Sequence, residues 1–171
     1  MSGPIDRHTV DQLVVAHLPA ALRLARRLAN NSDAAEEIVQ EALCRVLSRW
    51  KSFRGEASFS TWMMQIVVHV ARDRGRRLRD SKALTPDIRD TGAVEANEQL
   101  AADELSEIIR AAIDGLPDRQ REVALLSIAE GLGASEVAYI LQATEANVHT
   151  CLHLARKRIA QAIGVDYAQR K

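Results

Sequence analysis

Residues 135–158, SEVAYILQATEANVHTCLHLARKR, predict a short helix, a tight turn and a long second helix. Ser135 is placed to cap the first helix and Thr144 to cap the second. Apolar residues along the second helix recur at spacings of four, three and four: Val148, Leu152, Ala155 and Ile159. This pattern is typical of a helix-turn-helix. An ordinary helical hairpin is the alternative, because the turn holds Gln142-Ala143 where glycine is more usual.

The outer face of the long helix carries polar side chains near its start and basic ones further along. Polar groups there can reach base edges, and basic groups can meet phosphates. The candidate duplex-binding residues are Ser135, Thr144, Asn147, His149, Thr150, His153, Arg156 and Arg158. A metal site at His149, Cys151 and His153 is the alternative, but a cluster on one helix without a fourth ligand is usually accidental. We therefore expect no metal.

Residues 50–62, WKSFRGEASFSTW, hold four of the six aromatic residues, and the arginine cluster ARDRGRRLRD follows at residues 71–80. Rings that stack on unpaired bases, beside arginines that follow phosphates, are what single-stranded nucleic acid requires. The alternative is that the rings close a small helical core while the arginines coat a solvated face. Trp62 is predicted to pack, because Ile66 lies four residues later.

Composition indicates an all-helical protein without enzymatic machinery. Of the 171 residues 47% are apolar but only 4% aromatic, so Ala, Leu, Val and Ile must form the core. No apolar run approaches the roughly 20 residues of a membrane span. There is no signal-peptide pattern, and Cys44 and Cys151 stand alone, which together favour the cytoplasm. Neither a glycine-rich phosphate loop nor a catalytic constellation is present, so no cofactor is expected.

Helical periodicity falls into two stretches separated by turn-forming residues. Asp33 with Glu36 predicts a capping-box-like helix start, Ser58 or Ser60 a cap for a helix to about residue 79, and Cys44 a small core residue. We predict an all-α fold of two small domains, residues 1–80 and 98–171, joined by a flexible acidic linker at 81–97. The net charge is zero overall but +4 over residues 1–80, −3 over 81–103 and −1 over 104–171, so local patches can still bind a polyanion.

These segments together resemble the extracytoplasmic-function (ECF) class of bacterial sigma factors, over about residues 18–79 and 98–164. The runs that carry the resemblance are DAAEEIVQEALCRVLSRW at 33–50, FRGEASFSTW at 53–62, LPDRQRE at 116–122 and LHLARKRI at 152–159. The resemblance implies that residues 1–80 are sigma region 2 and residues 98–171 are sigma region 4. It also implies promoter-specific initiation by core RNA polymerase.

The family's roles transfer to matching positions of this chain. The helix expected to dock on the clamp of the polymerase's largest subunit carries Asp33, Glu36, Glu37, Val39, Gln40 and Glu41. The non-template strand of the −10 element would meet Phe53, Arg54, Ser58, Phe59, Ser60, Trp62, Gln65, His69, Arg72, Asp73, Arg76 and Arg77. The duplex-binding residues named above would read the −35 element. Other implied partners are the flap of the second-largest subunit and an anti-sigma protein.

The chain departs from the family pattern at several positions. The family often has basic residues where the recognition helix has His149, Cys151 and Leu154, so −35 binding is expected to be weak and less salt-sensitive. Met64 and Gln65 replace basic or aromatic residues, and His69 replaces a frequent asparagine. The alternative function is a sigma-like decoy that sequesters an anti-sigma protein without reading promoters.

Overall fold

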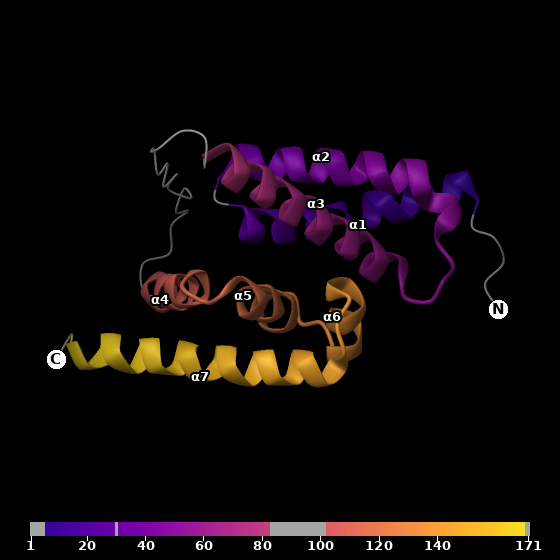
Figure 1. The fold of residues 1–171 in the computed structure, drawn as a ribbon. Helices are drawn as coiled ribbons and strands as arrows, with labels where there is room; N and C mark the ends of the chain where they lie inside the picture. The colour runs from indigo at the N-terminus through magenta and orange to yellow at the C-terminus, as the bar shows by residue number, and fades with distance from the viewer. Residues whose placement is uncertain (1–5, 30, 83–101, 170–171) are drawn as a thin grey trace. The chain divides into compact units, whose positions relative to one another are not determined.

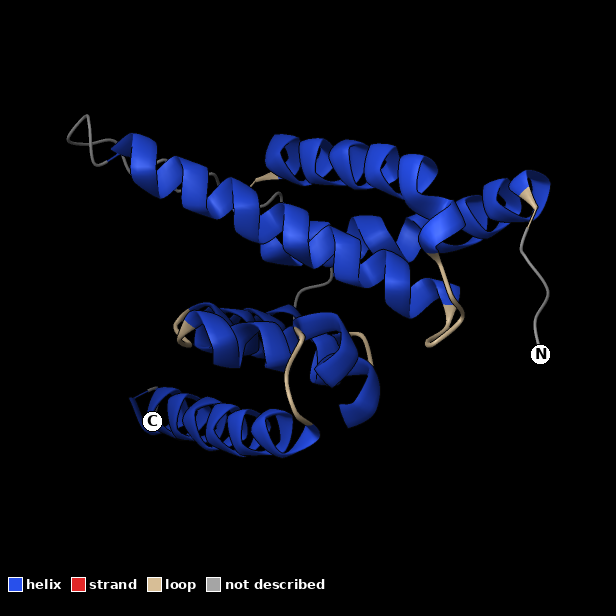
Figure 2. Ribbon diagram, turned by 45° about the vertical axis from the view of Figure 1, so that its right-hand side comes forward, coloured by secondary structure: helices blue, strands red, loops and turns tan. Residues whose placement is uncertain are grey.

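The computed structural model describes residues 6–29, 31–82 and 102–169, and every regular element within them is a helix (Figures 1 and 2). In chain order these are α1 Arg7–Leu28, α2 Ser32–Arg49, the 3-10 turn η1 Trp50–Ser52, α3 Phe59–Lys82, α4 Ala102–Asp114, α5 Asp118–Ala124, the π-helical turn η2 Leu125–Ala129, α6 Ala134–Leu141 and α7 Glu145–Gln169. The predicted all-helical fold is confirmed. The predicted linker lies outside the described residues, except for residues 81 and 82 at the end of α3.

The helices form two compact units, one built on α1–α3 and one on α4–α7. In the first unit each helix packs against the other two. Leu24 of α1, Val46 of α2 and Val67 of α3 are wholly buried. Burying one such side chain stabilises a fold by about 1.5–3 kcal/mol. These core positions are therefore aliphatic, as the composition predicted.

Each helix start in the first unit has a side-chain cap. The backbone N–H of Thr9 donates to Asp6 at 2.7 Å, and that of Ala34 donates to Asn31 at 2.7 Å. The predicted start of α2 at Asp33 is therefore wrong: Asn31 is the cap, and Asp33 already lies in the first turn of the helix. Ser58 caps α3 as predicted, with its hydroxyl accepting from the Thr61 N–H at 3.0 Å.

The second unit packs α4 and α5 against α7. Helix α4 ends at Gly115-Leu116-Pro117, where the Gly115 N–H still donates to the Ala111 carbonyl and Asp118 opens α5. The helical segment that begins with α5 continues to Ala129, and its last turn, η2, is π-helical. The side chains of Val123 and Leu126 in this segment are wholly buried.

The turn between α6 and α7 forms at a residue other than glycine. Gln142 adopts the left-handed conformation, with φ of 52°. The Ala143 N–H donates to the Ala138 carbonyl at 2.9 Å, which is the six-to-one bond of a Schellman motif with Gln142 at the left-handed position. Thr144 then caps α7 as predicted, because its hydroxyl accepts from the Asn147 N–H at 3.2 Å. The helix-turn-helix prediction is confirmed.

Gln142→Gly is expected to stabilise the protein by about 0.5–1 kcal/mol. The substitution removes the roughly 1–2 kcal/mol that an L-residue loses in the left-handed conformation, partly offset by the greater chain entropy of glycine. Gln142→Val is expected to destabilise it, because a β-branched side chain fits this conformation worse. Urea denaturation of the full chain, followed by circular dichroism, compares them. Equal stability of the Gly and Val variants would contradict the strained turn.

Candidate functional site

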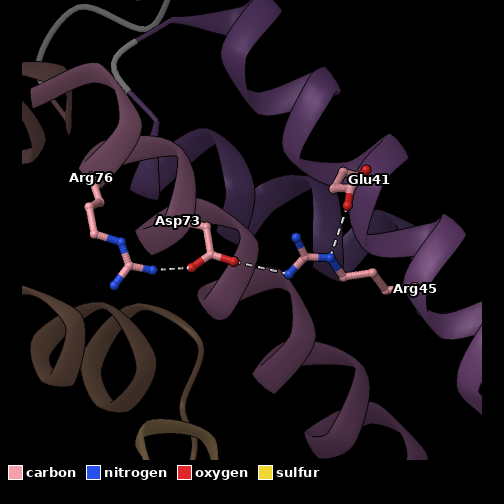
Figure 3. Close-up of polar contacts among 4 residues, drawn as sticks. All are labelled: Glu41, Arg45, Asp73 and Arg76. Carbon is pink, nitrogen blue, oxygen red and sulfur yellow. Dashed lines mark hydrogen bonds and ion pairs between the residues drawn. The ribbon is translucent and has the colours of Figure 1, made fainter. Parts of the chain in front are cut away.

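Charged side chains of α2 and α3 form a chain of ion pairs within the first unit (Figure 3). Arg45 donates to Glu41 at 2.9 Å and to Asp73 at 3.2 Å, and Arg76 donates to Asp73 at 2.6 Å. A second link joins Arg74 of α3 to Glu37 of α2. Ion pairs thus join the two helices in both directions, from Arg45 of α2 to Asp73 of α3 and from Arg74 of α3 to Glu37 of α2.

Asp73 is the carboxylate that connects the two helices in this chain of ion pairs. Burial alone raises the pKa of Asp73, but the hydrogen bond and charge of Arg45, together with those of Arg76, outweigh burial and lower the pKa below its usual 3.8. Asp73 therefore stays ionised throughout the physiological range and keeps both arginines oriented.

Asp73→Asn is expected to lower the melting temperature at pH 7 and to have less effect in acid. A carboxyl whose folded-state pKa is lowered contributes stability above its unfolded pKa and loses it as pH falls through the folded value, here below 3.8. Thermal melts at pH 7 and pH 3 would measure the difference between variant and wild type. Asp80→Asn, at an exposed position of the same helix, is the control. A difference that stays constant with pH would contradict the role given to Asp73.

An open groove of about 650 Å³ lies between α2 and the second half of α3. Its lining residues are Glu37, Ile38, Gln40, Glu41, Cys44, Arg45, Val70, Asp73, Arg74, Arg77, Leu78 and Ser81. Cys44 is exposed in this groove, so its predicted place in the core is wrong. Ala42 and Val46, on either side of it, take the buried positions of α2. The groove mixes acidic, basic and apolar groups.

Most residues predicted to dock on polymerase share the exposed surface of α2. This docking face consists of Asp33, Glu36, Glu37, Gln40 and Glu41. Val39 does not belong to it, because its side chain is only 6% exposed. With Ala35 and Ala42 it lies on the buried side of the helix. That part of the predicted surface is corrected, and the remaining five positions are available to a partner.

The aromatic segment closes on itself as a packed cluster. The ring centroid of Phe53 lies 5.6 Å from that of Phe59 and 5.4 Å from that of Trp62, and the Phe59 and Trp62 centroids are 5.6 Å apart. Phe59 and Trp62 are 6% and 8% exposed, so neither can be a stacking platform as the structure stands. Trp62 packs as predicted, whereas the direct strand contact predicted for Phe59 is corrected. Phe53 is half-buried, while Arg54 and Ser58 are exposed on the loop and Ser60 is half-buried.

The predicted strand-binding residues of α3 divide between two faces of that helix. Gln65, His69, Arg72 and Arg76 recur at spacings of four, three and four, and we name them the strand stripe. Asp73 and Arg77 instead line the groove beside α2. Those two residues therefore lie beside the docking face rather than along the stripe. Sequence spacing predicts this division. An α-helix has about 3.6 residues per turn, so consecutive residues point in different directions around its axis. Positions 73 and 77 therefore lie on a different face from positions 72 and 76.

Helix α7 presents the predicted duplex-binding residues to solvent. Val148 and Ala155 are wholly buried and Ile159 nearly so, whereas Asn147, His149, Thr150, His153, Arg156 and Arg158 are exposed. Ser135 is not the cap of α6: the helix begins at Ala134, and the Gly133 N–H donates to the Glu136 carboxylate at 3.0 Å. Ser135 is exposed in the first turn. Within the described residues no three His, Cys, Asp or Glu side chains gather into a possible metal site.

Arg45 and Arg74 are the site residues that sequence reasoning missed. The Glu41–Arg45 pair has a four-residue spacing that favours pairing on any helix. By contrast, Arg45 and Asp73 are 28 positions apart in the sequence, and Arg74 and Glu37 are 37 positions apart. No local pattern predicts those contacts.

No helix in the described ranges is long and apolar enough to cross a membrane.

Comparison with known proteins extends over both units. Residues 13–81 match the Sigma-70 region 2 family, and residues 106–159 match the Sigma-70, region 4 family. The ECF RNA polymerase sigma factor SigM of Mycobacterium tuberculosis is 30% identical, over 93% of this chain and 79% of its own. The ECF RNA polymerase sigma factor SigW of Bacillus subtilis is 27% identical, over 92% of this chain and 90% of its own.

Two solved structures share the fold. The sigma factor RpoE, in complex with the anti-sigma factor NepR from Bartonella quintana, aligns with a TM-score of 0.69 at 24% identity, covering 91% of this chain and 97% of RpoE. CnrH, in complex with the cytosolic domain of CnrY, aligns with a TM-score of 0.67 at 19% identity, covering 94% of this chain and 91% of CnrH. At these identities the likeness concerns the fold.

Proposed function

This chain belongs to the sigma-70 family as a sigma factor of the ECF class, and we propose that it directs core RNA polymerase to specific promoters. Residues 1–80 act as region 2, which docks on the polymerase and captures the −10 element. Residues 98–171 act as region 4, which reads the −35 element, and residues 81–97 connect the two regions. The observation that carries this proposal is the pair of family matches in order, each over a unit with an exposed charged helix face.

Docking is assigned to the acidic face of α2. Four of its five members are carboxylates, so its partner surface is basic, and the proposed partner is the clamp coiled coil of the largest subunit. Glu37 and Glu41 already hold Arg74 and Arg45 within the chain. Because exposed ion pairs contribute about 0–1 kcal/mol, a basic partner can share or replace these contacts at small cost.

Strand capture is assigned to the strand stripe and to the loop before α3. Extruding an unpaired base costs a few kcal/mol of unstacking, which contacts in the bound state must offset. Arg72 and Arg76 supply positive charge for phosphates, and Arg54 does so from the loop. The buried rings of Phe59 and Trp62 contribute indirectly, because they hold the loop that presents Phe53 and Arg54. The proposed mechanism is non-covalent throughout.

Reading of the −35 element is assigned to α7, whose exposed residues can enter the major groove of a duplex. Region 4 is also proposed to contact the flap of the second-largest subunit, which would place α7 over the promoter. The proposed site of action is the cytoplasm, where core polymerase is found. RpoE and CnrH were each solved with a binding partner, RpoE with an anti-sigma factor, and by analogy we propose that an anti-sigma protein controls this chain.

In vitro transcription with core polymerase and a randomised promoter library tests the proposal. Transcripts are expected to come from templates that share two sequence elements separated by a fixed spacing. Core polymerase alone is the control. Failure to enrich any sequence, despite tight binding to an anti-sigma protein, would support the decoy function instead.

His149→Ala is expected to change the preferred −35 bases, because an edge contact carries roughly 1–3 kcal/mol of discrimination. Arg158→Ala is expected to weaken all sequences about equally and to reduce the salt dependence of binding. His149→Lys adds a cation, so it should raise affinity at low salt and lose the gain as salt screens the charge. Binding of holoenzyme to promoter variants at several salt concentrations measures all three. A holoenzyme indifferent to the −35 sequence would contradict the assignment of α7.

A further inference from the structure

The exposed surface of α7 carries two different stripes of side chains. His149, His153 and Arg156 form one at spacings of four and three. The other, which we name the Leu154 stripe, contains Asn147, Thr150, Leu154 and Arg158 at spacings of three, four and four. Leu154 is a large apolar side chain that is 40% exposed between polar neighbours. The two stripes therefore offer different chemistry to a duplex.

Hydrogen bonds within α7 fix what the Leu154 stripe can present. The Thr150 hydroxyl donates to the Ala146 carbonyl at 3.0 Å, so its proton is committed to the backbone. The outward contribution of Thr150 is then its methyl group and the acceptor side of its oxygen. The Asn147 amide oxygen accepts from the Cys151 thiol at 3.6 Å, which leaves the amide NH₂ group to donate outward. Along this stripe the pattern is a donor, a methyl group, an isobutyl group and a cation.

That pattern matches one feature of the major groove. Thymine alone among the four bases carries a methyl group there, at C5, beside the O4 acceptor. An isobutyl group and a threonine methyl one turn apart can enclose such a methyl group and exclude water from it. A leucine gains nothing from a phosphate, whereas Arg158 one turn further on can meet one.

We propose that Leu154, with the Thr150 methyl group, contacts the C5 methyl of a thymine in the −35 element, and so makes that thymine a specificity determinant. Asn147 donates to an acceptor of an adjacent base pair. The inference rests on the proposed function, in which α7 reads the −35 duplex. It assigns a specificity-determining role to Leu154, where the family often has a basic residue that could contact phosphate instead.

Deoxyuridine substitution is the test, because it removes the C5 methyl and leaves pairing and hydrogen-bonding groups unchanged. Each thymine of the −35 element, on either strand, is replaced singly in the promoter obtained by library selection. Wild-type holoenzyme is expected to lose about fourfold in affinity at one thymine, equivalent to burial of one methyl group at about 0.8 kcal/mol. Holoenzyme with Leu154→Ala is expected to lose most of this penalty, because only the Thr150 methyl group then remains beside the thymine methyl.

Matched variants separate the methyl contact from general effects on the helix. Thr150→Val keeps the methyl group and should keep the penalty, whereas Thr150→Ser removes the methyl group and should reduce it. Gln161→Ala, at an exposed position two turns beyond Leu154, should leave the penalty unchanged. Leu154→Ala should bind the deoxyuridine promoter as tightly as wild type does, which shows that the helix is intact. Wild type and Leu154→Ala, each measured on the thymine and the deoxyuridine promoter, form a double-mutant cycle between the Leu154 side chain and the thymine methyl group.

Two results would overturn the inference while leaving the proposed function in place. One is a −35 element whose base-pair changes matter but whose thymines all tolerate deoxyuridine. The other is a deoxyuridine penalty of the same size in wild type and Leu154→Ala. By contrast, indifference to every base-pair change in the −35 region would overturn the proposed function of α7 together with this inference.

Discussion

Holoenzyme carrying Arg72→Ala and Arg76→Ala is expected to assemble normally but to open its promoter poorly. Both residues belong to the strand stripe of α3, and each charge-assisted hydrogen bond to a phosphate contributes about 1.5 kcal/mol or more. Loss of two contacts should reduce the equilibrium for the open complex on the order of 100-fold. Permanganate footprinting of unpaired thymines measures the melted fraction directly.

The matched control removes the same charge from the other face of the same helix. Arg74→Ala with Arg77→Ala also deletes two arginines, but both of these line the groove beside α2. This variant should melt the promoter like wild type once core polymerase is saturated with sigma. Equal defects in the two double variants would show that only the total charge of α3 matters. Normal melting in the Arg72/Arg76 variant would contradict the strand stripe itself.

Glu37→Lys with Glu41→Lys is expected to weaken assembly with core polymerase by roughly 100-fold or more. The change reverses two charges at the centre of the docking face, so attraction to a basic surface becomes repulsion, and close charge pairs across interfaces couple by about 1.5–7 kcal/mol. Fluorescence titration of labelled sigma with core polymerase measures the dissociation constant. Weakening should be greatest at low salt, where screening is least.

The docking variant also breaks two ion pairs inside the chain, and a second variant separates this effect. Arg74→Ala removes the pairing of Glu37 with α3 while leaving the glutamate in place. If loss of that internal pair caused the defect, Arg74→Ala would reproduce it. We expect instead that its affinity for core stays within about fivefold of wild type, because an exposed ion pair contributes at most about 1 kcal/mol. Equal affinity of the charge-reversed variant and wild type would show that the docking face is misassigned.

The internal ion pairs also bear on how a chain of zero net charge can hold nucleic acid. Arg45, Arg74 and Arg76 are each paired with a carboxylate of the first unit. The net charge of +4 over residues 1–80 already counts these carboxylates, so pairing leaves it unchanged but lowers the positive potential around the three arginines. A polyanion responds to the local electric field rather than to the net charge of the whole chain. We therefore expect the strand stripe to bind DNA within the holoenzyme.

Local sequence determined the helices, most of their caps and the helix-turn-helix. Hydrogen bonds three or four residues apart, such as those made by Ser58 and Thr144, depend only on neighbours in the chain. The exposed face of α7 followed from the same periodicity, since Val148, Ala155 and Ile159 fix which side is buried. Where such reasoning failed locally, at Asp33 and Ser135, a nearby residue was the better cap, which local pattern alone does not decide.

Tertiary structure alone decided which charged and aromatic groups meet. Arg45 reaches Asp73 across 28 positions of sequence and Arg74 reaches Glu37 across 37, distances over which no periodicity carries information. The burial of Phe59 and Trp62 depends on how α3 and its preceding loop pack, and that of Val39 on how α2 is rotated against its neighbours. The physical reason is that helix formation is set by hydrogen bonds within one turn. The pairing of helix faces is instead set by the packing of three apolar stripes at once.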